Sequence, residues 1–179
     1  MDHSSTTAHP PPGPLEFLDF AVACGGQLYR TAYLLTGGDP HLAEDLVQEA
    51  LSRMFVRWRR LSRLENPAGY ARTVLVNTFL SQRRRRSSRE QVTFEFPEIA
   101  VTDHDPALRL TLLRALRDLS AQDRAVLVLR FWEDRSVEET AEVLRLSATA
   151  VRSRSHRALN RIRALLGDEF AEHAAADPR

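Results

Sequence analysis

Arginines and small polar side chains dominate residues 145–166, near the end of the chain. This segment holds six arginines and no acidic residue. If it is helical, its outward face presents Arg152, Ser153, His156, Arg157 and Asn160. A guanidinium can donate two hydrogen bonds to a guanine edge or to a phosphate, so such a face suits the major groove of duplex DNA. The plainer alternative is a basic amphipathic helix that packs on its neighbours.

The residues around this face predict two short helices joined by a tight turn. Ser136-Val-Glu-Glu139 has the pattern of a capping box, which satisfies the first free N–H groups of a helix. Ser147 is placed to cap a second, longer helix that runs through Leu166. The inward positions of the two helices, with the turn residue between them, are Val137, Thr140, Ala141, Leu144, Leu146, Val151, Ser155, Ala158 and Ile162. This arrangement predicts a helix-turn-helix.

A second polar face lies in the first half of the chain. Asn66-Pro67 is a good helix start, because asparagine caps and proline suits the first helical position. On the helix that follows, one face carries Tyr70, Thr73, Asn77, Ser81 and Arg84. An aromatic ring can stack on a base while arginines follow the backbone, so this face suits single-stranded or unwinding DNA. Alternatively, Tyr70 lies at the edge of the core with its hydroxyl in water.

A small acidic patch lies on the preceding predicted helix. Asp45, Gln48, Glu49 and Ser52 have the spacing i, i+3, i+4, i+7 and therefore share one face. One interpretation is a solvated surface with a Glu49–Arg53 pair. The other is a docking face for a basic surface of a partner protein.

The sequence does not contain a recognisable catalytic constellation. It has no P-loop, and its six histidines (3, 9, 41, 104, 156 and 173) are scattered. Cys24 is the single cysteine, so an internal disulfide and a cysteine-cluster metal site are excluded. We therefore expect no enzymatic activity, no metal and no cofactor.

The elements that must position these residues are all predicted to be helical. Apolar residues at helical spacing (Leu18, Val22, Leu28, Ala32 and Leu35) predict a first helix that ends at Gly37-Gly38. Asp39-Pro40 begins a second helix reaching Trp58, and the third helix runs from Asn66 into Arg83–Arg86. We predict that residues 1–14 form a disordered leader and that residues 87–107 form a flexible acidic linker. A helical pattern returns from Leu108. The predicted fold class is all-α, with two small helical domains joined by the flexible acidic linker.

Charge is segregated along a nearly neutral chain. All 25 basic residues among the 179 are arginines, and the net charge is only +1. Residues 51–89 nevertheless sum to +10 and residues 108–166 to +5, with −5 between them over 90–107. Two basic surfaces on one chain suggest that the protein binds a long polyanion. The hydrophobic content of 43% suits a packed core. Neither a signal peptide nor an apolar run of about 20 residues is present, so we expect a cytoplasmic protein.

The order of these segments resembles a known family. The stretch from Glu44-Asp45-Leu46 to Trp58 precedes Asn66-Pro67-Ala-Gly-Tyr70, then Asn77, an arginine run, an acidic linker and a helix-turn-helix containing Val151-Arg-Ser-Arg154. This order resembles the extracytoplasmic-function (ECF) sigma factors of bacterial RNA polymerase, and in particular their SigE-like members from actinobacteria. Arg145 stands in the turn where the family usually has glycine.

The resemblance implies sigma region 2 at residues 15–86, region 4 at 108–166 and an acidic tail at 167–179. Its expected partners are core RNA polymerase (β and β′ subunits), promoter DNA and, in many relatives, an anti-sigma factor, with no membrane insertion. The residues implied for polymerase docking are Asp45, Gln48, Glu49 and Ser52. Those implied for the −10 promoter element are Arg59, Arg60, Arg63, Asn66, Tyr70, Thr73, Asn77, Arg83 and Arg84. Those implied for the −35 element are Ser147, Thr149, Arg152, Ser153, His156, Arg157 and Arg161.

One rival interpretation uses only the last 60 residues. A conventional helix-turn-helix regulator would dimerise and bind an operator unaided, with half-sites about one helical turn, ~34–36 Å, apart. An enzyme is a third alternative, which the absence of a recognisable catalytic constellation in the sequence disfavours.

Overall fold

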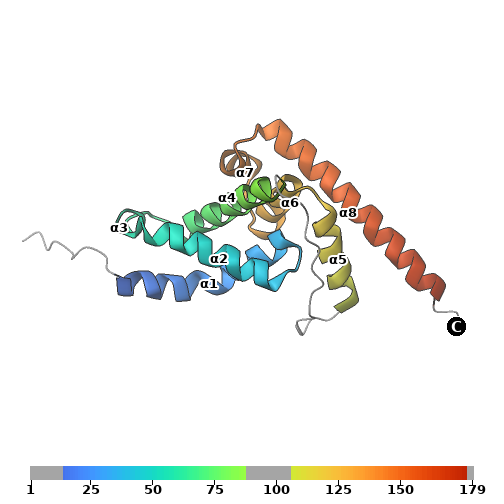
Figure 1. Ribbon diagram of the computed structural model, residues 1–179. Coiled ribbons are helices and arrows are strands. Elements are labelled where there is room, and N and C mark those ends of the chain that lie inside the picture. The colour runs from blue at the N-terminus through green and yellow to red at the C-terminus, as the bar shows by residue number, and fades with distance from the viewer. Residues whose placement is uncertain (1–13, 88–105, 177–179) are drawn as a thin grey trace, which may run out of the picture.

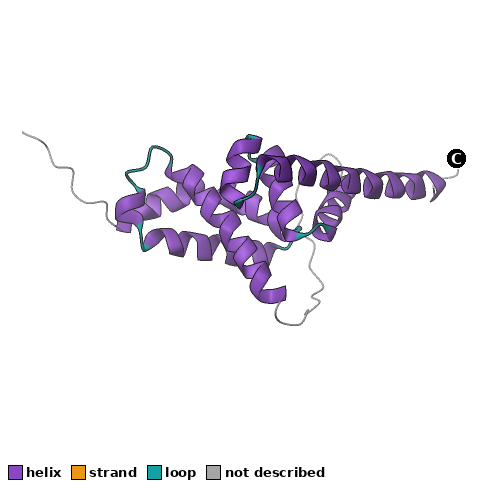
Figure 2. Ribbon diagram, turned by 90° about the horizontal axis from the view of Figure 1, so that it is seen from above, coloured by secondary structure: helices purple, strands orange, loops and turns teal. Residues whose placement is uncertain are grey.

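The computed structural model describes residues 14–87 and 106–176, and all regular secondary structure within them is helical. An N-terminal unit contains α1 (Pro14–Thr36), α2 (Pro40–Phe55), the one-turn α3 (Trp58–Leu61) and α4 (Pro67–Ser87). A C-terminal unit contains α5 (Pro106–Asp118), α6 (Ala121–Leu127), the π-helical turn η1 (Val128–Trp132), α7 (Val137–Leu144) and α8 (Ala148–Ala176). The all-α prediction is confirmed (Figures 1 and 2). Residues 1–13 of the expected leader and almost all of the expected linker lie outside the described residues, and Pro14 begins α1.

Side-chain caps begin several helices where the sequence predicts them. The Asp39 carboxylate accepts a hydrogen bond from the Leu42 N–H at 3.0 Å. Asn66 accepts one from the Gly69 N–H at 2.7 Å. A Cβ at position 69 would lie 2.6 Å from the Asn66 amide nitrogen, so a larger residue there would displace the capping side chain. In the C-terminal unit the Ser136–Glu139 capping box forms in both directions.

The core stripe of α1 differs from the predicted one. Leu18 and Val22 were expected to face inward, but they are 58% and 75% exposed. The helix instead turns Phe17 and Phe20 toward Trp58, with ring centroids 5.2 Å and 4.7 Å from the indole. The N-terminal part of α1 carries apolar residues in two registers, and the aromatic register buries the larger area.

The same aromatic cluster breaks the second predicted helix. A continuous helix to Trp58 was expected, but α2 ends at Phe55 and Trp58 begins α3. Phe55 is 50% exposed, whereas Trp58 is only 7% exposed. Turning the chain between these residues places the indole against α1.

The two units pack directly on each other. Buried Val126 and Leu129 of the C-terminal unit belong to the same apolar cluster as Leu28, Leu75 and Phe79 of the N-terminal unit. Contacts between the units join α1 to α5, α6 and η1, and α4 to α6 and α7. Figures 1 and 2 show the units side by side in both views. The described part of the molecule therefore contains an extensive interface between the two expected domains.

Arg124 on α6 binds the ends of two helices at this interface. Its side chain is 1% exposed and donates to the carbonyls of Leu35 (2.8 Å), Arg117 (2.7 Å) and Leu119 (3.2 Å). These carbonyls lie at the C-termini of α1 and α5, where a cation is favourable. Burial lowers the pKa of Arg124 to about 10, so the group stays charged at neutral pH.

The last helix is longer than predicted. We expected it to end near Leu166, ahead of a polar tail, but α8 continues to Ala176. Residues 168–176 are rich in alanine and glutamate, which are strong helix formers, and the next proline is Pro178. In both views the C-terminal half of α8 projects beyond the rest of the molecule (Figures 1 and 2).

Candidate nucleic-acid interface

α7 and α8 form the predicted helix-turn-helix. Arg145 ends α7 in the left-handed conformation (φ 54°, ψ 47°), and the Leu146 N–H donates to the Ala141 carbonyl at 2.9 Å. Glycine adopts the left-handed conformation most easily because it has no Cβ. Arginine at this position therefore costs about 1 kcal/mol of backbone strain. Ser147 then caps α8 by accepting from the Ala150 N–H at 3.1 Å. Caps and turn together fix the direction in which α8 leaves α7.

The outward face of α8 collects most residues predicted to contact the −35 element. Thr149, Arg152, Ser153 and His156 are all exposed. Arg152 forms an ion pair with Glu138 at 3.1 Å, but both side chains are at least 60% exposed, so the pair is weak and easily exchanged for a phosphate or a base. The inward positions Val151, Ala158 and Ile162 are buried, as expected.

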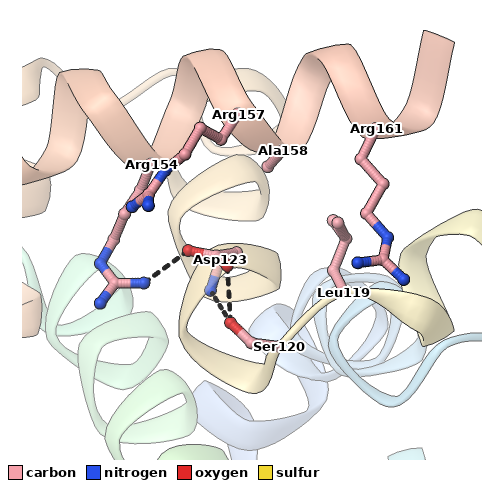
Figure 3. Close-up of a pocket in the computed structure, with 7 residues that line it drawn as sticks. All are labelled: Leu119, Ser120, Asp123, Arg154, Arg157, Ala158 and Arg161. Carbon is pink, nitrogen blue, oxygen red and sulfur yellow. Dashed lines mark hydrogen bonds and ion pairs between the residues drawn. The ribbon is translucent and has the colours of Figure 1, made fainter. Parts of the chain in front are cut away.

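Two further residues of the predicted set line a pocket beside this face. Arg157 and Arg161 border a hollow of about 370 Å³ between α8 and the α5–α6 corner (Figure 3). Arg154 lines it too, and its guanidinium pairs with Asp123 at 2.6 Å. Arg154 was not predicted as a site residue, although its spacing to Arg157 and Arg161 (i, i+3, i+7) was the available signal. The pocket carries three arginines against one carboxylate.

The second polar face forms a concave site in the N-terminal unit. Tyr70, Thr73 and Asn77 of α4 line one pocket of about 480 Å³, as the sequence placed them on one face. Arg53 and Arg57 complete the same wall from the end of α2 and the turn after it. These two arginines were missed as site residues, although their i, i+4 spacing could have identified them. Tyr70, Thr73 and Asn77 thus share one hollow with two arginines.

The remaining residues predicted for the −10 element are spread around this pocket. Arg59, Arg60 and Arg63 are exposed on and after α3, and Arg83 and Arg84 are exposed toward the end of α4. Asn66 is exposed as well, but its side-chain oxygen is engaged by the Gly69 N–H. Its demonstrable role is therefore to begin α4.

The acidic patch on α2 is largely free. Asp45, Gln48 and Ser52 are exposed, and Glu49 is half-buried. The Glu49 carboxylate accepts a hydrogen bond from the Gln82 side chain of α4 and pairs with Arg53. These partners, the Gln82 hydrogen bond above all, hold the pKa of Glu49 below its usual value. Glu49 is thus tied to α4, whereas its three neighbours face solvent.

Other site chemistries find no support within the described residues. No cluster of three or more histidine, cysteine, aspartate or glutamate side chains there is arranged to hold a metal ion. No described helix combines the length and apolar character needed to cross a membrane. Cys24 is buried, and that burial raises the pKa of its thiol, which disfavours the reactive thiolate.

Comparisons with known proteins agree with this geometry. The family model described as Sigma-70 region 2 matches residues 21–89, and that described as Sigma-70, region 4 matches residues 115–164. The first match contains the α2 patch and the α4 pocket. The second contains the helix-turn-helix.

Curated relatives are similar over most of the chain. The RNA polymerase sigma-E factor of Streptomyces coelicolor is 38% identical over 151 residues, which cover 83% of this chain and 85% of that protein. The ECF RNA polymerase sigma factor SigL of Mycobacterium tuberculosis is 33% identical over 146 residues, covering 78% and 82%.

Solved structures share the fold. The sigma factor RpoE of Bartonella quintana, in complex with the anti-sigma factor NepR, matches with a TM-score of 0.70 at 26% identity, over 85% of this chain and 97% of that one. The ECF sigma factor SigJ of Mycobacterium tuberculosis matches with a TM-score of 0.58 at 27% identity, covering 89% and 60%. With both regions in order and relatives that match most of its length, the chain belongs to the Sigma-70 family of RNA polymerase sigma factors, within the ECF group.

Proposed function

We propose that this sigma factor, which directs promoter-specific initiation by core RNA polymerase, uses three separate surfaces. These are the exposed α2 patch, the α4 pocket and the outward face of α8. The observation that carries the proposal is the pairing of a concave and a convex basic site on one chain. The concave site holds Tyr70 and Asn77, and the convex site holds Arg152 and Ser153.

In this proposal the α4 pocket receives an unpaired base of the −10 element. A pocket of about 480 Å³ has room for a base, Tyr70 offers a stacking surface, and the Asn77 amide can both donate and accept hydrogen bonds. Extruding a base costs a few kcal/mol, and least where stacking is weak. Arg59, Arg60, Arg63, Arg83 and Arg84 would hold the backbone on either side.

The outward face of α8 reads the −35 element as duplex in the major groove. Arg152 and Ser153 lie in its second turn, close to the N-terminus that enters the groove in helix-turn-helix proteins. Arg157 and Arg161 lie further along and, with Arg154, would hold phosphates beside the groove. Ser147 and Thr149 complete the proposed surface at the start of the helix.

The α2 patch would dock core polymerase through its β′ subunit. Asp45, Gln48 and Ser52 are exposed and available for this contact. We further propose region 2 at residues 15–86 and region 4 at 108–166, a cytoplasmic location and no catalysis by the chain itself. An anti-sigma partner is proposed by analogy with the RpoE–NepR complex.

Transcription in vitro tests the function. Purified protein added to core polymerase should direct initiation at promoters of its own genome, and mapping the start sites should reveal common −10 and −35 sequences. If the protein neither binds core nor directs initiation at any promoter, the proposal fails. Tight binding of the protein alone to a palindrome would favour the rival regulator.

A charge reversal tests the docking surface. Asp45→Arg with Gln48→Arg alters exposed residues that have no side-chain partner among those the structure describes, whereas changing Glu49 would also break its hydrogen bond to Gln82 of α4. The double variant should lose core binding at least ~100-fold while keeping its melting temperature. Asp19→Arg, an exposed acid on α1, is the matched control and should bind normally.

A further inference from the structure

A glutamate of the C-terminal unit is buried inside the N-terminal unit. Glu133 follows η1, and its side chain is only 2% exposed. Its carboxylate accepts a hydrogen bond from the Thr31 hydroxyl of α1 and forms an ion pair with Arg72 of α4, with 3.1 Å between Oε2 and Nε. The Arg72 N–H is not aligned for a hydrogen bond, so this contact is primarily electrostatic. A residue 102 positions away from Thr31 thus closes a gap between two helices of the other unit.

This placement needs the two units to stay together. A buried carboxylate is costly unless an opposite charge and hydrogen-bond donors surround it. For Glu133, both side-chain partners found among the described residues belong to the N-terminal unit. When the units separate, water can hydrate all three groups. The Glu133 contact therefore depends on the closed arrangement.

A second set of contacts holds the same interface. Arg124 donates to the Leu35 carbonyl at 2.8 Å, and Arg117 donates to the Gly37 carbonyl at 3.1 Å. Both carbonyls lie at the C-terminal end of α1, one to two turns beyond Thr31. These two hydrogen bonds fix the C-terminal unit to the end of α1, and Glu133 adds an ion pair with α4.

The closed arrangement conflicts with simultaneous contact to both promoter elements, a point that rests on the proposed function. Elements centred about 25 base pairs apart are separated by ~85 Å on straight duplex DNA. A compact body of roughly 145 residues has a diameter of about 40 Å. The α4 pocket and the outward face of α8 therefore cannot reach both elements while the two units remain packed together.

We propose that Glu133 is a latch that holds the sigma factor closed, and that its release from Arg72 and Thr31 is required before both promoter elements are bound. The latch sets the fraction of protein that is competent to bind. Opening is reversible because hydration of the two separated charges offsets the loss of their buried ion pair.

The substitution Glu133→Gln tests the latch because it removes the negative charge while leaving the size of the side chain nearly unchanged. The closed form would then leave Arg72 without its counter-charge, so the open population should rise at least ~10-fold. Small-angle scattering of the full chain alone should show a larger radius of gyration, and amides of η1 should exchange hydrogen at least ~10-fold faster. Glu142→Gln, an exposed acid on α7, is the matched control and should change neither quantity.

Two further variants keep the test decisive if Glu133→Gln loses stability. Thr31→Val removes the hydroxyl that donates to Glu133 and should open the protein in the same direction but less. Arg72→Gln leaves the Glu133 carboxylate buried and uncompensated, so the double variant Arg72→Gln with Glu133→Gln should be more closed than Arg72→Gln alone. Purely additive opening by the two substitutions would overturn the ion-pair latch.

Transcription separates the latch from the proposed function. At limiting protein, Glu133→Gln should raise initiation ~3–10-fold relative to the native chain and the Glu142→Gln control. Opening in solution without this gain, in a protein whose native form is active, would overturn the inhibitory role. A native protein that never initiates would refute the proposed function, while the scattering and exchange results would still decide whether Glu133 closes the molecule.

Discussion

The two basic surfaces of this sigma factor have opposite shapes. In the N-terminal unit Tyr70, Thr73 and Asn77 line a hollow, and in the C-terminal unit Arg152 and Ser153 stand on a convex helix. A hollow can accept a nucleotide base that has left the base stack of DNA, whereas a convex helix fits the groove of an intact duplex. In the proposed function, this difference in shape divides promoter recognition between melted and paired DNA.

The interface between the two units is the most vulnerable part of this design. Replacing Arg124 by methionine keeps the length of the side chain but leaves the carbonyls of Leu35, Arg117 and Leu119 without their donor. The free energy of unfolding should fall by about 3–5 kcal/mol, as judged by urea denaturation. Arg30→Met, at an exposed position of α1, should change it by less than ~0.5 kcal/mol. Equal effects of the two variants would show that Arg124 does not join the units.

The convex surface is tested by Arg152→Ala. We expect promoter affinity of the holoenzyme to fall ~10–100-fold at the native −35 sequence, since a two-bond contact to a base contributes ~1–3 kcal/mol. Competition binding against promoters mutated in the −35 element measures this effect. The variant should discriminate less between native and mutated elements; unchanged discrimination would remove Arg152 from the reading face.

The concave surface is tested by Asn77→Ala. Asn77 is exposed and lines the pocket, so its loss should leave the fold intact and reduce formation of melted promoter complexes ~10-fold. Permanganate reactivity of unpaired thymines reports melting. Gln27→Ala on α1 provides the exposed-amide control, and it should melt promoters at the native rate.

The smallest effect concerns the cap that orients the convex helix. Hydrogen bonds from the Ser136 N–H and Arg135 hold the pKa of Glu139 below its ordinary value of 4.5. Because the folded-state pKa is depressed, this carboxylate stabilises the fold above pH 4.5 and loses that contribution as the pH falls through the folded-state pKa.

Glu139→Gln should therefore flatten the acid limb of stability against pH. Melting temperatures between about pH 3 and 7 would show it, with Glu142→Gln as the exposed reference. Identical acid limbs for the native chain and Glu139→Gln would mean that the capping box does not persist in solution.

Local chemistry made the helices and their starts predictable. Asp39, Asn66, Ser136 and Ser147 all cap as expected, because a cap depends on residues within three positions of it. The outward face of α8 was predictable for the same reason. A repeat of 3.6 residues fixes which side chains share a face once a helix is assigned.

Contacts between distant segments were not predictable. The inward register of α1 depends on Trp58, which selects Phe17 and Phe20 over Leu18 and Val22. Glu133 gave no local signal, since its partners lie in the other unit. Local patterns describe each unit alone, and the packing of the two units requires the three-dimensional structure.

The division between melted and paired DNA is tested most directly by binding two promoter templates to the holoenzyme. One template is fully duplex, and the other has the same −35 duplex with a single-stranded −10 strand. The account predicts that Asn77→Ala loses ~10-fold affinity on the single-stranded template, whereas Arg152→Ala loses affinity on both. Equal losses for both variants on both templates would contradict a concave site for unpaired bases and a convex site for duplex.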